Sequence, residues 1–160
     1  MAESRNKRVL IVDNDGYFMG VSLAEKLAME GKKVTIMSHQ SHIARYMDFT
    51  LETPNQMRKL HKLGVEVVTE FLPTKIEHGK VHAANIFDTD GHEKVWEVDA
   101  VVLVTQRRSN EALFRELKDK VGFDTLKKEG ISGVYLIGDC VAPRTAEEAV
   151  LEGLKVGSVI

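Results

Sequence analysis

The residues that could do chemistry begin with a short polar loop, Asp13-Asn14-Asp15-Gly16, which follows an apolar stretch of the chain. A loop between a strand and a helix binds pyrophosphate when glycines occupy the pattern G-x-G-x-x-G, because the backbone then comes close to the phosphates. Aligned on the apolar stretch, the three glycine positions hold Asp13, Asp15 and Phe18. Two carboxylates would repel a pyrophosphate, and a β-carbon at each position would crowd its approach.

Two other roles are open to these aspartates. We favour the interpretation that Asp13 or Asp15 caps the following helix and complements its dipole. The alternative is a nucleotide that binds in a displaced position, or through a metal ion held by the two carboxylates. The loop is not an EF-hand, since positions six and twelve of that motif would fall on Phe18 and Ala24.

The end of the second apolar stretch carries residues that could recognise a ribose or a phosphate. The acidic side chain that usually holds an adenosine ribose would fall at Ser38, which offers only a hydroxyl group. His39 and His42 could contact a phosphate and Arg45 could favour a 2′-phosphate, although such side chains are also common in solvated loops. With Ser38 in place of an acid, ordinary NAD binding is disfavoured.

Other catalytic and metal-binding patterns are absent from the sequence. The single cysteine, Cys140, allows no internal disulfide, no cysteine-rich zinc site and no four-thiolate iron–sulfur cluster. The six histidines show no metal-ligand spacing, so we expect no metal site, and there is no G-x-S-x-G, P-loop or H-E-x-x-H motif. One cysteine also favours a reducing, cytoplasmic compartment.

The composition excludes several classes of protein. With 22 Lys and Arg against 24 Asp and Glu, the formal net charge is −2, so we expect neither a nucleic acid nor an anionic lipid as a partner. Hydrophobic residues make up 43% and charged residues 29% of the 160 residues, as in an ordinary folded domain. The longest apolar run, residues 100–104, is too short to span a membrane.

Alternating strands and helices must position these residues. Residues 8–12 and 33–37 are typical of buried strands, and the helix expected between them, residues 19–30, ends at Gly31. Strand, helix and strand within about thirty residues indicate a parallel βαβ unit.

The next segment predicts a second helix and a third strand. Residues 41–51 could form one irregular helix. Thr53 as N-cap and Pro54 at the first helical position open a helix that ends at Gly64, and residues 65–69 form the third strand.

The rest of the chain predicts a β-meander, two strands and two helices. The meander strands are residues 74–77, 80–87 and 92–98, joined through His-Gly and Asp-Gly turns. The elements that follow are a fully buried strand at 99–105, a polar helix at 110–120, a strand at 133–137, and a helix at 145–159 that opens with the capping-box pattern Thr-x-x-Glu.

Four stretches resemble one family of flavoproteins. They are KRVLIVDNDGYFMGVSLAEKLA, YMDFTLETPNQMRKLHKLGVE, VVLVTQRRSNEAL and GVYLIGDCVAPRTAEEAVLEGLKVG. They are similar to the C-terminal, nucleotide-binding-like region of trimethylamine and dimethylamine dehydrogenases, which group with dienoyl-CoA reductase and the old-yellow-enzyme-like flavoproteins. The resemblance covers residues 7–160.

The resemblance implies a much longer parent enzyme. Its members have an N-terminal barrel with FMN, a 4Fe-4S cluster and the amine site, followed by two nested nucleotide-binding-like domains that hold ADP, or FAD and NADPH in relatives. We expect no cofactor on this chain alone. The implied partners are the remainder of the dehydrogenase and an electron-transfer flavoprotein, and a homodimer is a further option.

Two more candidate sites come from the resemblance. Residues 105–108 stand where related enzymes carry a T-G-R-x-P-N turn at the nucleotide edge, with Gln106 in place of the glycine. In the resembling flavoproteins, the aspartate equivalent to Asp139 in the Gly138-Asp139 pair hydrogen-bonds to the linker of the flavin, so it could touch an adenine nucleotide once the other domain is present. No catalytic residue is expected. The candidate nucleotide-binding residues are Asp13, Asp15, Gly16, Ser38, His39, Arg45, Gln106, Gly138 and Asp139.

We expect a three-layer, Rossmann-like α/β sandwich with a mainly parallel sheet and a β-meander crossover. The sheet order should be 3-2-1 with residues 99–105 beside the first strand. Residues 133–137 either extend this sheet to 3-2-1-4-5 or belong to the sheet of another domain. The expected domains are a disordered N-terminus (1–6), a Rossmann-like, NAD(P)-binding-type domain (7–130), and the closing strand and helix of a flavin- or ADP-binding-type domain (131–160).

Two functions of different classes stay open. The first is a non-catalytic module of a flavin and iron–sulfur amine dehydrogenase-type oxidoreductase, with a degenerate dinucleotide site and a structural, subunit-contact or electron-acceptor docking role. The alternative is a working adenine-nucleotide or NAD(P)H-binding domain of an NADH:flavin oxidoreductase or dienoyl-CoA reductase-like enzyme. For a third function, an independent small enzyme, the sequence offers no nucleophile–base pair.

Overall fold

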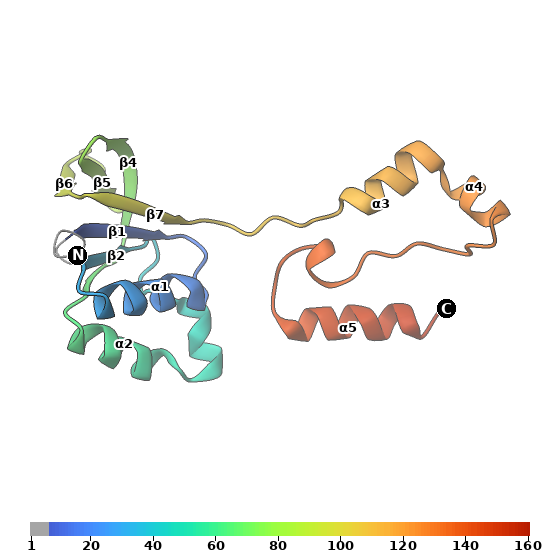
Figure 1. Cartoon of the computed structure of the whole chain (residues 1–160), viewed down its shortest axis with the longest axis horizontal. Coiled ribbons are helices and arrows are strands. Elements are labelled where there is room, and N and C mark those ends of the chain that lie inside the picture. Colours follow the sequence, from blue (N-terminus) through green and yellow to red (C-terminus); the bar gives the residue numbers. More distant parts are fainter. Residues whose placement is uncertain (1–6) are drawn as a thin grey trace. The chain divides into compact units, whose positions relative to one another are not determined.

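The computed structural model describes residues 7–160, and the chain divides into two compact units, one that ends at Gln106 and one that runs Arg107–Ile160. Figure 1 shows the course of the chain through both. The expectation of a disordered N-terminus at 1–6 lies outside the described residues, and the domain boundary expected after residue 130 stays a prediction.

The first unit is built on a four-stranded parallel sheet in the order β3-β2-β1-β7. Its strands are β1 (Arg8–Asp13), β2 (Lys33–Met37), β3 (Glu66–Val68) and β7 (Ala100–Val104). Because β1 is central, both of its faces are covered, and its side chains alternate between the two. The predicted order 3-2-1, with the strand at 99–105 beside the first, is confirmed.

Helices cover one face of this sheet (Figure 1). They are α1 (Phe18–Met29), the short 3-10 helix η1 (Arg45–Thr50) and α2 (Thr53–Lys62). Val9 and Ile11 of β1 point to this side and join the larger hydrophobic core, which burial of apolar surface stabilises.

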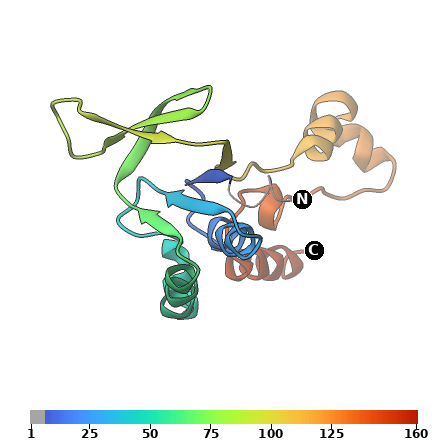
Figure 2. The same ribbon diagram turned by 60° about the vertical axis from the view of Figure 1, so that its left-hand side comes forward.

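An antiparallel meander covers the other face, as Figure 2 shows from the side. It consists of β4 (Phe71–Glu77), β5 (Lys80–Asn85) and β6 (Glu93–Glu97) in that order. Leu10 and Val12 of β1 point to this side, into a second buried cluster. Helices, parallel sheet and meander form the predicted three-layer α/β arrangement.

Two expected strands differ from the structure. The strand at 99–105, expected to be fully buried, is β7 at the edge of the described sheet, where Leu103 is 56% exposed because a neighbour covers only one side of the strand. Residues 133–137 pair with no strand of the described chain, so the sheet has no fifth member. A strand needs a hydrogen-bonding neighbour, and none is present beside this segment.

The helix caps follow the sequence only in part. Thr53 was expected as the N-cap of α2, but Glu52 takes that position. The Thr53 hydroxyl instead donates a hydrogen bond to Asp48 Oδ1 at 2.7 Å, which ties the start of α2 to η1. The capping box of Thr145 and Glu148 at the start of the last helix is confirmed.

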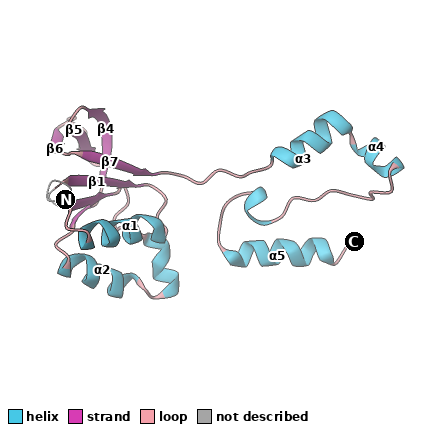
Figure 3. Ribbon diagram, in the orientation of Figure 1, coloured by secondary structure: helices cyan, strands magenta, loops and turns pink. Residues whose placement is uncertain are grey.

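The second unit contains helices and loops, as Figure 3 shows by colour. Its helices bury very little: Leu126 is the only buried hydrophobic residue among the described residues of this unit, whereas Val150 is 71% and Leu154 is 68% exposed. None of the described helices is long and apolar enough to cross a membrane. The helices are α3 (Ala112–Glu116), the π-helical turn η2 (Leu117–Val121), α4 (Phe123–Lys128), the 3-10 turn η3 (Gly138–Cys140) and α5 (Ala146–Gly157).

The difference in burial predicts a difference in hydrogen exchange. Amide hydrogens of α5 should exchange at least about a hundredfold faster than those of β1, because α5 can open without breaking a core. Hydrogen exchange of the full chain, followed by mass spectrometry of peptides from the two elements, measures this ratio. Equal protection of α5 and β1 would contradict the burial described above.

Candidate functional site

A cleft of about 540 Å³ lies at the carboxyl ends of the parallel strands β1, β2 and β7. In open α/β sheets, ligands bind at this edge, and the volume is within the range of small-molecule sites. We call it the edge cleft. Its lining residues are Asn14, His39, Leu72, Ile86, Thr105 and Gln106.

Asp13 ends β1 and is completely buried. Its Oδ1 accepts a hydrogen bond from the Gly16 backbone N–H at 3.3 Å, whereas its Oδ2 has no hydrogen-bond partner among the described residues. Helix α1 passes close over the carboxyl group, since a β-carbon added at Gly20 would lie 2.7 Å from Asp13 Cγ. The carboxyl group therefore fills the space between the end of β1 and the first turns of α1.

Burial raises the pKa of the Asp13 carboxyl above its ordinary value of 3.8, because the charged form loses its hydration. The Gly16 N–H opposes this shift and has the smaller effect. The expected cap on α1 is wrong: Tyr17 holds the N-cap position, and no side chain caps the helix. Asp13 cannot act as a cap because its carboxyl group is enclosed beneath the helix.

Gly16 and Ser38 serve the folding of the loops. Gly16 has a φ of +72°, and a β-carbon there would lie 3.1 Å from Gln40 Oε1. The carbonyl oxygen of Gly16 accepts a hydrogen bond from the Tyr46 N–H at 3.0 Å. Ser38 is 1% exposed, and its hydroxyl accepts a hydrogen bond from the Gln40 N–H at 3.2 Å. Ser38 thus has no surface with which to hold a ribose.

Of the residues predicted from sequence, His39 and Gln106 meet in the edge cleft. His39 Nδ1 lies 3.0 Å from Asn14 Oδ1, which links the loops that follow β1 and β2. Arg45 is not a lining residue, and its guanidinium lies 5.9 Å from the ring centroid of Tyr46.

Sequence reasoning missed four lining residues: Asn14, Leu72, Ile86 and Thr105. Asn14 follows the predicted strand at 8–12 and Thr105 ends the one at 99–105, so their position at the carboxyl edge was the available signal. Leu72 and Ile86 carried no such signal, because nothing in the sequence indicates where the meander lies over the sheet edge.

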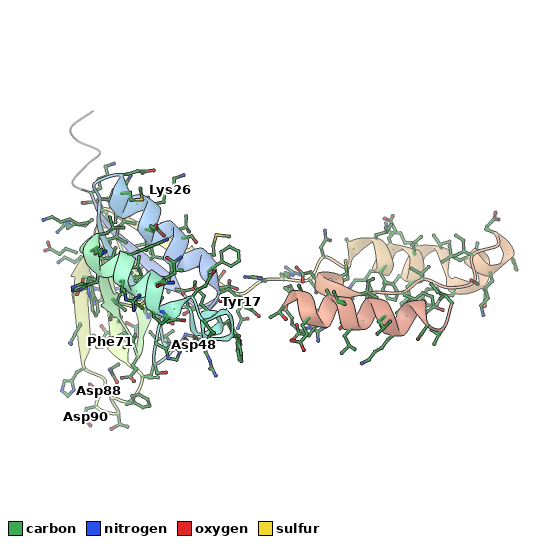
Figure 4. All side chains as sticks on the ribbon, turned by 90° about the horizontal axis from the view of Figure 1, so that it is seen from below. Tyr17, Lys26, Asp48, Phe71, Asp88 and Asp90 are labelled. Carbon is green, nitrogen blue, oxygen red and sulfur yellow. The ribbon has the colours of Figure 1, made fainter. Side chains whose placement is uncertain are left out.

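Aromatic side chains gather beside the start of α1. The rings of Tyr17 and Tyr46 stack with centroids 4.4 Å apart, and Phe49 lies 6.4 Å from Tyr46. Phe49 is 83% exposed, and the neighbouring Phe18 is 55% exposed. We call Tyr17, Phe18, Tyr46 and Phe49 the aromatic patch. Figure 4 labels Tyr17 at this end of α1 and Lys26 toward the other.

The turn around Gly138 is fixed to α5 in the second unit. Glu152 accepts a hydrogen bond from the Gly138 N–H at 2.7 Å and also pairs with Arg144. Gly138 has a φ of +63°, and a β-carbon there would lie 3.3 Å from Ala149 Cβ. This turn leaves Asp139 exposed.

One group of potential metal ligands exists in the described residues, although the histidine spacing predicted none. Ligand atoms of Asp88, Asp90 and His92 lie within 4.8 Å of one another at the β5–β6 hairpin, where Figure 4 labels the two aspartates. His92 Nδ1 lies 3.1 Å from Asp88 Oδ2, and the Asp90 N–H donates to Asp88 Oδ1 at 2.8 Å. These internal contacts account for the arrangement without an ion.

Comparisons with known proteins identify the family of the chain. A family model described as "OYE-like second alpha/beta domain" matches residues 2–119. The chain is 36% identical to dimethylamine dehydrogenase of Hyphomicrobium sp. (strain x), over 96% of this chain and 23% of that protein.

Two solved structures of amine-oxidising enzymes are also similar to this chain. Histamine dehydrogenase from Rhizobium sp. 4-9 matches with a TM-score of 0.83 and 29% identity over 94% of this chain and 22% of that one. 6-Hydroxypseudooxynicotine amine oxidase from Pseudomonas geniculata N1 matches with a TM-score of 0.80 and 29% identity, over 96% of this chain and 22% of that one. The chain spans less than a quarter of the length of each relative.

The contact between Asp13 and Gly20 predicts the effect of one methyl group. Gly20→Ala should lower the free energy of unfolding by about 1–3 kcal/mol, because the new β-carbon overlaps Asp13 Cγ. Ser22→Ala, at an exposed position of the same helix, is the control and should change it by less than about 0.5 kcal/mol. Urea unfolding followed by the fluorescence of Trp96, the only tryptophan, measures both. Equal stabilities would show that α1 does not lie against Asp13.

The raised pKa of Asp13 predicts a pH dependence of stability. Below 3.8 the carboxyl is protonated in both the folded and the unfolded chain and contributes nothing. As pH rises above 3.8 the unfolded chain ionises first, so stability falls until the higher folded pKa is passed. Compared with wild type, Asp13→Asn should therefore gain stability as pH rises.

Asp99→Asn is the control for this measurement. Hydrogen bonds from the backbone and then the side chain of Arg8 lower the pKa of Asp99, so its contribution is complete above 3.8 and is lost only as pH falls through the lower folded value. The difference in the free energy of unfolding between this variant and wild type should stay constant above about pH 5. Urea unfolding at several pH values tests both variants, and a constant difference for Asp13→Asn as well would contradict a raised pKa of the buried Asp13.

Proposed function

The chain belongs to the OYE-like second alpha/beta domain family, and from this we propose that it is a non-catalytic, Rossmann-like module of an amine dehydrogenase-type flavoprotein oxidoreductase, with a degenerate dinucleotide site. Its role is structural, in subunit contact or in docking an electron acceptor. The observation that carries the proposal is the buried carboxyl group of Asp13 at the end of β1.

Asp13 argues against a pyrophosphate at this loop for steric and electrostatic reasons. A dinucleotide-binding loop has glycine at this position so that the phosphates can approach the backbone. Here a side chain takes that space beneath α1, and Asp15 adds a carboxyl group two residues later. An ionised carboxylate would repel the phosphates, and a protonated one would still occupy the space.

The second unit supports a role inside a larger protein. A folded unit needs a buried apolar core, yet this one leaves the apolar side chains of α5 exposed. We propose that the remainder of a dehydrogenase covers them and that residues 131–160 complete a flavin- or ADP-binding-type domain there. The aromatic patch of the first unit is a second surface for such a contact, or for an electron-transfer flavoprotein.

The cofactors of the parent family fit this chain only in small part. A 4Fe-4S cluster does not fit, because Cys140 is the only cysteine and four thiolates are needed. For ADP, the exposed Asp139 on the fixed turn at Gly138 offers one hydrogen-bonding carboxylate. FMN and the cluster would therefore belong to other parts of the parent enzyme, in a reducing, cytoplasmic compartment.

Calorimetric titration of the full chain with ADP, NADH, NADPH and FAD at low salt tests the proposal. We expect none of these nucleotides to bind with a dissociation constant below about 1 mM. The loop offers the phosphates neither space nor positive charge. The double variant Asp13→Gly/Asp15→Gly should gain at least about tenfold in affinity for one of these nucleotides.

The matched control is Asp88→Gly/Asp90→Gly, which removes the same two charges from the distant β5–β6 hairpin. It should bind no better than wild type. Micromolar binding to the wild-type chain would overturn the proposal and favour the alternative, a working adenine-nucleotide or NAD(P)H-binding domain. An equal gain in both double variants would show that net charge alone, and not the loop, limits binding.

A further inference from the structure

We propose that the edge cleft binds an uncharged, planar nitrogen heterocycle of nucleoside size and discriminates against its phosphorylated forms. This goes beyond the proposed function, which assigns no ligand to the first unit. It is carried by the chemistry of the two walls of the cleft and by the lack of charge among its lining residues.

The first wall is polar and comes from the carboxyl ends of the parallel strands. Asn14 Oδ1 can only accept a hydrogen bond, so the contact at 3.0 Å makes His39 Nδ1 the donor. In the neutral ring, His39 Nε2 is then an acceptor, and the Asn14 amide nitrogen keeps its two donors. Thr105 and Gln106 add a hydroxyl and an amide to this wall. Donors and acceptors are thus mixed, as an amide or nucleobase edge requires.

The second wall is apolar and comes from the meander. Leu72 of β4 pairs with Ala84 of β5, Ile86 follows the end of β5, and both side chains line the cleft. They are 45% and 46% exposed. Two aliphatic side chains that remain half-exposed at the wall of a cleft offer a flat apolar surface for the face of a ring.

Charge decides between a nucleoside and a nucleotide. No Lys, Arg, Asp or Glu is among the lining residues of the edge cleft. The loop that supplies Asn14 also carries the carboxyl group of Asp15 next to it, which makes the surroundings less favourable for an anion.

Nuclear magnetic resonance titration of the isotope-labelled full chain tests this inference, with adenosine, AMP and ADP as probes. Adenosine should shift the amide signals of cleft residues in a saturable way, and affinity should fall at least about threefold with each phosphate group added. An order in which ADP binds as tightly as adenosine, or tighter, would overturn the inference. So would a titration in which adenosine does not saturate.

Two matched pairs of variants locate the binding. His39→Ala should weaken adenosine binding about fivefold by removing a hydrogen bond, whereas His42→Ala, which alters a contact with Asp48 instead, should not. Leu72→Ala should weaken it by a similar factor, and Ile76→Ala, an equally exposed position on the same strand outside the cleft, should not. Equal effects within both pairs would show that adenosine binds elsewhere.

The outcomes separate this inference from the proposed function. If no probe binds, the inference fails and the degenerate dinucleotide site stands. If ADP binds with micromolar affinity, the proposed function fails, and the order of the three affinities still decides the inference. If adenosine binds and ADP does not, both stand.

Discussion

The burial of one carboxyl group organises this end of the first unit. Asp13 lies at the carboxyl end of the central strand, α1 runs close above it, and Gly20 is the position that gives it room. One of its oxygens accepts the Gly16 N–H and the other has no partner, so the group is held in place by its surroundings rather than by a complete set of hydrogen bonds. A buried polar group with an unsatisfied atom costs stability, which the core on either side of β1 must offset.

The remainder of the loop is built around this group. The carbonyl oxygen of Gly16 is bound by the Tyr46 N–H, which connects the loop after β1 to η1, and Ser38 is enclosed at the end of β2. Asp13 and Ser38, which align with positions that contact a dinucleotide in other α/β proteins, are buried here. What stays accessible at the same edge is the neutral, half-apolar edge cleft, a different surface from the one that a pyrophosphate needs.

Much of the fold could be predicted because it depends on local patterns. The uninterrupted apolar run at residues 9–12 placed β1 between two layers, and the Thr145 pattern placed the cap of α5. The inward turn of Asp13 could not be predicted, because a loop aspartate is usually a cap and its burial depends on where α1 lies. Residues 133–137 have the composition of a strand, but a strand depends on its neighbour, which a local sequence pattern does not specify.

The most direct test of the proposed degenerate site is the titration of the Asp13 carboxyl carbon by carbon-13 nuclear magnetic resonance, without and with ADP. We predict a midpoint above the ordinary 3.8 and above that of Asp99 in the same sample, and no change when ADP is added. A midpoint at or below 3.8, or one that moves on addition of ADP, would contradict it, because Asp13 would then be exposed to solvent or would face a nucleotide at this loop.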